Sequence, residues 1–134
     1  MSNNVNRFHP DYNTNYLAQA IPLVVGQAAI RNRVVLSIID GIHGLWDGGP
    51  QGSTPLFSWE NKTVYFATDV VAADRIACNA INQQRLLAGL QPVESAPANA
   101  YDNWTVRQTG IAEAGMAGLG EWRDSSIQYQ LLTV

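Results

Sequence analysis

The clearest pattern in the chain is an aliphatic run followed by a cluster of glycines. Residues 34–40 are mostly aliphatic and end in Asp40, and residues 41–52 hold five glycines and Pro50. A short, uninterrupted apolar run is typical of a strand buried on both faces, and a stretch rich in glycine and proline is typical of a loop. We therefore predict a buried strand over residues 34–40 and a loop at its carboxyl end, the edge where open α/β sheets usually hold ligands.

Two helices are expected, one before and one after this region. Apolar residues recur at helical spacing over residues 14–28, and Pro22 is expected to kink or split that helix. A second helix is expected over residues 70–88. Asp69 precedes it as a potential N-cap, and Gly89 follows it as a residue that commonly ends helices.

The remaining segments complete the expected sheet. A second strand is expected over residues 63–68, a third helix over about 105–117, and a final strand over residues 127–134, where apolar and polar residues alternate at first. Helices that lead directly into core strands are typical of α/β proteins. We expect residues 1–134 to form a single α/β domain, with a small, partly parallel sheet of at least three strands and about three helices packed on it.

Composition narrows the class of function. The chain has 134 residues, 46% of them hydrophobic, which is enough for one domain with one core. Only 14% are charged, against roughly 25% in an average soluble domain, so an unusual share of the surface is expected to be uncharged. This favours a homo-oligomer or a partner chain. A net charge of −3 without a Lys/Arg cluster argues against nucleic-acid binding.

Cysteine content and the N-terminus exclude further classes. Cys78 is the only cysteine, so the chain alone cannot hold a disulfide, a four-thiolate zinc site or an iron–sulfur cluster. Its place in a predicted helix favours a small buried thiol over a reactive nucleophile. The sequence has neither a basic-then-apolar leader nor an apolar stretch long enough to span a bilayer, which predicts a cytoplasmic protein with no membrane contact.

Four blocks of the chain resemble, in order, the domain-of-unknown-function 362 family. They are NVNRFH at 4–9, IIDGIHGLWDGGPQG at 38–52, ATDVVAADRIACNAI at 67–81 and AGMAGLG at 114–120. The family has an N-P-S-R-F-H opening, a strand ending in D-A or D-G, a G-G-P loop, an S/T-D-P-V-A-L-D helix start and a closing G-L-G. Val70 stands where the family usually has proline, and the chain resembles only the C-terminal part of a longer family domain. The resemblance implies an α/β half-domain and no particular reaction.

Acidic residues at the predicted strand ends form the candidate ligand site. If the strands are neighbours, four carboxylates would converge, and such oxygens suit Mg²⁺ or Ca²⁺. They belong to Asp40, Asp47, Asp69 and Asp74. Each also has an ordinary alternative, since Asp69 could simply cap a helix and Asp40 could serve a turn. Asp74 could pair with an arginine, the candidates being Arg7, Arg31 and Arg75.

The glycine-rich loop offers a second kind of site. Backbone N–H groups around Gly48 and Gly49, and at the helix start after Asp69, could hold an anion, although the loop matches no known phosphate-binding fingerprint. His43 in the loop, joined by His9, could act as acid, base or ligand, whereas such histidines more often bond to backbone.

Two functions therefore remain open. One is a non-catalytic half-domain that associates with itself or with a partner, which low charge and short length favour. The other is an enzyme or ligand-binding domain with a metal or anion site around DGIHGLWDGGP.

Overall fold

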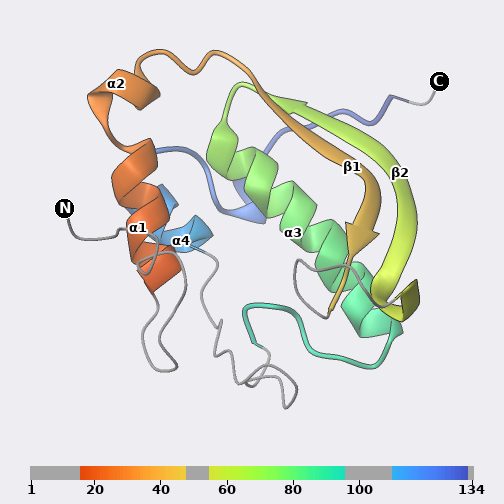
Figure 1. Cartoon of the computed structure of the whole chain (residues 1–134). Helices are drawn as coiled ribbons and strands as arrows, with labels where there is room; N and C mark the ends of the chain where they lie inside the picture. Colours follow the sequence, from red (N-terminus) through yellow and green to blue (C-terminus); the bar gives the residue numbers. More distant parts are fainter. Residues whose placement is uncertain (1–15, 48–54, 96–109, 133–134) are drawn as a thin grey trace.

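A two-stranded hairpin and one long helix form the framework of the chain. The computed structural model describes residues 16–47, 55–95 and 110–132. The strands β1 (Ser37–Leu45) and β2 (Ser58–Ala67) both pack on α3 (Val70–Leu87) (Figure 1). Helix α3 also contacts α4, which in turn contacts α1. The shorter elements are α1 (Tyr16–Val25), α2 (Ala28–Arg31), η2 (Pro55–Phe57), α4 (Ile111–Met116) and η3 (Asp124–Ser126).

The hairpin has one half-buried face and one exposed face. The strands pair antiparallel, with Ile38 opposite Phe66 and Asp40 opposite Val64. Along β2, exposed and half-buried residues alternate without interruption. Because successive side chains of a strand point to opposite faces, the half-buried residues form the face toward α3 and the exposed residues form the outer face.

The predicted sheet of at least three strands, partly parallel, is wrong. Among the described residues the sheet has two strands, and they are antiparallel. The apolar run is not buried on both faces either, since Val35 is 80% and Ile38 60% exposed. Residues 41–45, predicted as a loop, continue β1 and pair with β2 across the hairpin.

Two glycines stay in β1 because aromatic rings of β2 cover them. A Cβ atom at Gly41 would lie 2.7 Å from Cε2 of Tyr65, and one at Gly44 would overlap the ring of Trp59. Only glycine leaves room for these rings at the strand surface. The glycines that suggested a loop are therefore packing positions of a strand.

A β-bulge lies midway along the hairpin. From Gly41 to His43 the chain advances two residues along β1, while the paired positions Thr63 and Glu60 are three apart in β2. Lys62 takes up the extra residue with a φ of 53°. The side-chain amide of Asn61 donates to the carbonyl oxygen of Gly41 at 2.9 Å and bridges the irregular stretch.

Helix α3 matches its sequence prediction. The Asp69 side chain accepts from the backbone N–H groups of Val71 and Ala72, both at 2.9 Å, and Gly89 follows the helix with a φ of 75°. The prediction of a buried thiol is also confirmed, because Cys78 is 7% exposed. Burial, followed by the nearby Glu94 carboxylate, raises the pKa of Cys78.

The core beneath α3 is small. Val71 and Cys78 of α3 meet Ile111 and Ala114 of α4, and the partly buried side chains around them are Val70, Leu119 and Trp122. Five hydrophobic residues of the described chain are buried, whereas eighteen large hydrophobic side chains are exposed. Much of the apolar surface of this chain therefore faces solvent.

The terminal helices and the tail depart partly from prediction. Pro22 lies inside α1 and does not split it; the helix ends at Val25, and α2 begins at Ala28 after Gly26 and Gln27. The third helix is helical over Ile111–Met116, and residues 105–109 of that prediction lie outside the described residues. Residues 127–132 run extended from η3 toward the C-terminus but pair with no strand of the described chain (Figure 1), so the predicted final strand is not formed there. None of the helices in the described ranges has the length and apolar character of a membrane span.

Candidate functional site

The structure does not bring the predicted strand-end carboxylates together. Asp69 follows β2 at the hairpin end where Ser37 pairs with Ala67, and Asp47 follows β1 at the opposite end, where Leu45 pairs with Ser58. At about 3.3 Å per residue, the two ends are roughly 25 Å apart. The convergence assumed parallel neighbours, and antiparallel pairing separates the carboxyl ends of the two strands.

Asp69 has a structural role that its position explains. Besides capping α3, its Oδ2 accepts from the backbone N–H of Glu121 at 2.7 Å. The neighbouring Gly120 is held close to this carboxylate, since a Cβ atom there would lie 2.8 Å from Cβ of Val71. Asp69 thus joins the start of α3 to the segment that follows α4.

Asp40 and His43 lie within β1, on exposed positions. Asp40 is not in a turn; its Oδ1 accepts from the backbone N–H of Ile42 at 3.0 Å. In the strand register, His43 of β1 lies opposite Glu60 of β2. The predicted residues His9, Gly48 and Gly49 lie outside the described residues.

Asp74 occupies an exposed position of α3 with no ion pair in the described chain. Desolvation of its carboxyl raises the pKa of Asp74 above the usual value. Two of the proposed arginine partners are used elsewhere, since Arg31 donates to the carbonyl oxygen of Gly118 at 2.7 Å and Arg75 pairs with Glu94. The third, Arg7, lies outside the described residues. Within the described ranges, no three His, Cys, Asp or Glu residues are grouped so as to hold a metal ion. Ligand binding by the predicted residues stays a prediction.

Asp47 contributes to the attachment of the β1 end to α3. Nη1 of Arg85 lies 3.4 Å from Oδ1 of Asp47 and donates to the carbonyl oxygen of Trp46 at 2.8 Å. Nε of the same arginine donates to the carbonyl oxygen of Gln91 at 2.8 Å. Arg85 therefore ties the hairpin and the segment after α3 to one turn of the helix.

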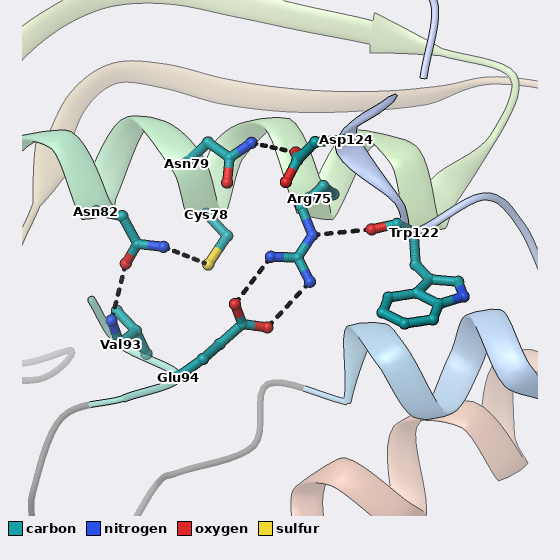
Figure 2. A network of polar contacts seen from close by, with 8 residues as sticks. All are labelled: Arg75, Cys78, Asn79, Asn82, Val93, Glu94, Trp122 and Asp124. Atoms are coloured by element: carbon teal, nitrogen blue, oxygen red, sulfur yellow. Dashed lines mark hydrogen bonds and ion pairs between the residues drawn. The ribbon is translucent and has the colours of Figure 1, made fainter. Parts of the chain in front are cut away.

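A cluster of polar contacts in the described residues centres on Arg75 and was not predicted. Its guanidinium makes two hydrogen bonds to the Glu94 carboxylate, at 2.8 and 3.0 Å, and Nε donates to the carbonyl oxygen of Trp122 at 3.1 Å (Figure 2). The hydrogen-bonded Glu94 raises the pKa of Arg75 further. We call Arg75, Glu94 and the Trp122 carbonyl the arginine clamp.

Asn82 and Asn79 extend the arginine clamp along α3. Oδ1 of Asn82 accepts from the backbone N–H of Val93 at 2.8 Å, and its Nδ2 donates to Sγ of Cys78 at 3.7 Å (Figure 2). The side-chain amide of Asn79 donates to Oδ1 of Asp124 at 2.6 Å. These bonds hold two separate segments, 90–95 and 119–124, on one helix, which is a role in stability.

A helical-spacing signal could have revealed this cluster. Val71, Arg75, Cys78 and Asn82 follow one another at intervals of four, three and four residues and so share one face of α3. An arginine between two apolar residues on a core-facing stripe requires a buried acceptor. The identity of Glu94 as that acceptor depends on how the following segment folds back, which spacing alone does not provide.

A small cavity lies where α1, α2 and the start of α3 meet. Its volume is about 70 Å³, and its lining is mostly aliphatic with one guanidinium. Ligand pockets for small molecules usually measure a few hundred Å³. The lining residues are Val25, Ile30, Arg31, Val34, Thr68, Val70 and Leu119.

The exposed side of the hairpin is the most distinctive surface of the described chain. Ile38, Val64 and Phe66 are 60%, 41% and 67% exposed, and Ile38 and Phe66 lie directly opposite each other across the strands. We call these three residues the outer hairpin face. Each strand has a neighbour on one side only within the described chain, so both edges of the sheet are open to pairing.

Comparison with known proteins assigns neither a family nor a function to the chain. No family model matches the chain, and no similar curated protein or solved structure was found.

Proposed function

We propose that this chain is a non-catalytic association module that binds another protein surface through the outer hairpin face. The observation that carries the proposal is the exposed cross-strand pair of Ile38 and Phe66, with the exposed Val64 beside Phe66 on the same face of β2. Contiguous exposed apolar surface on a folded chain is typical of interaction sites.

The geometry of the sheet supports the proposal independently. Two strands covered by one helix leave the opposite face in water, and a sheet of this size gains stability from a further strand or a second covering layer. Covering Phe66 and Ile38 would remove apolar area worth about 25 cal/mol per Å². Association therefore offers this face the burial that the rest of the described chain does not provide.

The test compares two charge substitutions in the full chain. Phe66→Glu places a charge on the outer hairpin face, and Leu87→Glu places one at the C-terminal end of α3, on a residue that is 81% exposed. We expect wild-type chain to associate in a concentration-dependent manner in analytical ultracentrifugation. Phe66→Glu should weaken association at least about tenfold, and Leu87→Glu should leave it nearly unchanged. Equal effects of the two substitutions, or a wild-type chain that remains monomeric and binds no partner, would contradict the proposal.

A further inference from the structure

We infer that the associating partner is a second copy of the chain, whose residues 127–132 add to the free edge of β1 as a third strand. This inference rests on the proposed association through the outer hairpin face. Residues 127–132 are called the tail segment below.

The tail segment has the properties of a strand without a partner. Its sequence, IQYQLL, alternates apolar and polar residues up to Leu131 and contains no charge and no proline. The backbone at Ile127 is extended, with φ −77° and ψ 124°, and the segment pairs with no strand of the described chain. Tyr129, Leu131 and Leu132 are 73%, 76% and 76% exposed. Extended, alternating and exposed segments are suited to adding to a sheet edge.

The free edge of β1 is the better acceptor of the two. On β2, the bulge at Lys62 distorts the edge, and Lys62 forms an exposed ion pair with Glu60 at 2.9 Å. Bulges and edge lysines oppose strand addition. The half of β1 from Ser37 to Gly41 carries one charge, Asp40, and no lysine. An uncharged tail meets no like charge there.

Strand addition at this edge joins apolar surface on both copies. An added strand lies in the plane of the sheet, so Tyr129 and Leu131 on one side of the tail would border Ile38, while Leu132 would point to the opposite face. Main-chain hydrogen bonds between the two strands then provide most of the affinity, and a twofold pair forms this contact twice.

Reciprocal exchange explains why the occupant is a second copy. In the structure, the tail segment of the same chain pairs with no strand while the edge of β1 is free of a further strand in the described residues. A twofold arrangement uses each tail and each edge once and leaves none over. Placed beside β1, the apolar side of the tail would extend the row formed by Ile38 and Phe66.

Hydrogen–deuterium exchange on the full chain at several concentrations tests the inference. We expect amides of the tail segment and of residues 37–41 to exchange slowly at high concentration and to lose this protection together on dilution. Protection of the tail at every concentration would mean that it pairs within its own copy and would overturn the inference. An unprotected tail in an associated chain would overturn it as well.

Two matched double variants provide a second test. Tyr129→Asp with Leu131→Asp places two charges on the apolar side of the tail, and Gln128→Asp with Gln130→Asp places two on the other side. The first should weaken dimerisation on the order of a hundredfold and the second by only a few-fold. Equal dissociation constants for the two variants would overturn the inference. If Phe66→Glu abolishes association and the first double variant does not, the association module stands and the tail is not its occupant; if neither matters, both proposals fail.

Discussion

The arginine clamp and the outer hairpin face distribute polarity in opposite ways. Arg75, a permanently charged side chain, is 7% exposed, whereas Phe66, an aromatic hydrocarbon, is 67% exposed. Burial of the guanidinium is tolerated because it donates three hydrogen bonds to acceptors on two segments. Exposure of the phenyl ring has no such compensation within the described chain. The first region satisfies its charge within the chain, whereas the second leaves apolar side chains exposed in the described residues.

The largest expected effect on stability comes from removing the guanidinium of the arginine clamp. Arg75→Ala leaves the Glu94 carboxylate and the Trp122 carbonyl without their donor, and we expect the free energy of unfolding to fall by about 2–3 kcal/mol. Urea denaturation followed by circular dichroism measures it. Lys62→Ala, which breaks an exposed ion pair whose side chains are 74% and 62% exposed, is the control and should change stability by less than about 1 kcal/mol. Similar losses for both variants would show that the clamp is not a stabilising feature.

A much smaller effect on stability is expected from a substitution in the outer hairpin face. Phe66→Ser removes a ring that makes few contacts in the single chain, so unfolding of dilute monomer should change by less than about 1 kcal/mol. The same substitution should weaken association strongly. Urea denaturation at low concentration, beside ultracentrifugation at high concentration, separates the two quantities. A large loss of monomer stability would mean that Phe66 belongs to the core of one chain.

The smallest expected effect concerns Asp74, whose pKa is raised by desolvation. A carboxyl with a raised pKa in the folded state binds its proton more tightly there than in the unfolded chain, so its contribution favours folding below the unfolded value of 3.8 and is lost as pH rises through the folded pKa. Asp74→Asn should therefore be slightly more stable than wild type at neutral pH. The difference should shrink when urea midpoints are compared near pH 3.5. A difference that grows on acidification would contradict the assignment.

Local sequence signals were sufficient to predict α3, whereas the sheet prediction was wrong because strand pairing depends on long-range contacts. Asp69 and Gly89 act on backbone groups within a few residues, so their roles as cap and helix end follow from the sequence. Gly41 and Gly44 are residues typical of a loop, and only the rings of Tyr65 and Trp59 across the hairpin explain their place in a strand. Register and strand direction depend on such partners.

The candidate ligand site depended on the same missing information. The predictions placed Asp69 at the start of a helix and Asp47 after a strand, as the structure does. Convergence of the carboxylates, however, required parallel strands, and the strands are antiparallel. The arginine clamp was missed for a related reason. Its partners lie 19 and 47 residues from Arg75, a separation at which helical spacing indicates that a partner is needed without indicating which residue provides it.

The separation of the clamp's partners has a consequence for synthesis of the chain. Helix α3 is complete at Leu87, but Arg75 acquires Glu94 only after that residue has left the ribosome, and the Trp122 carbonyl later still. Chains grow at about 5–20 residues per second, so the nascent helix spends a few seconds with its guanidinium incompletely paired. During that interval water is the available partner for Arg75, and the small core under α3 forms only when Ile111 and Ala114 have been synthesised.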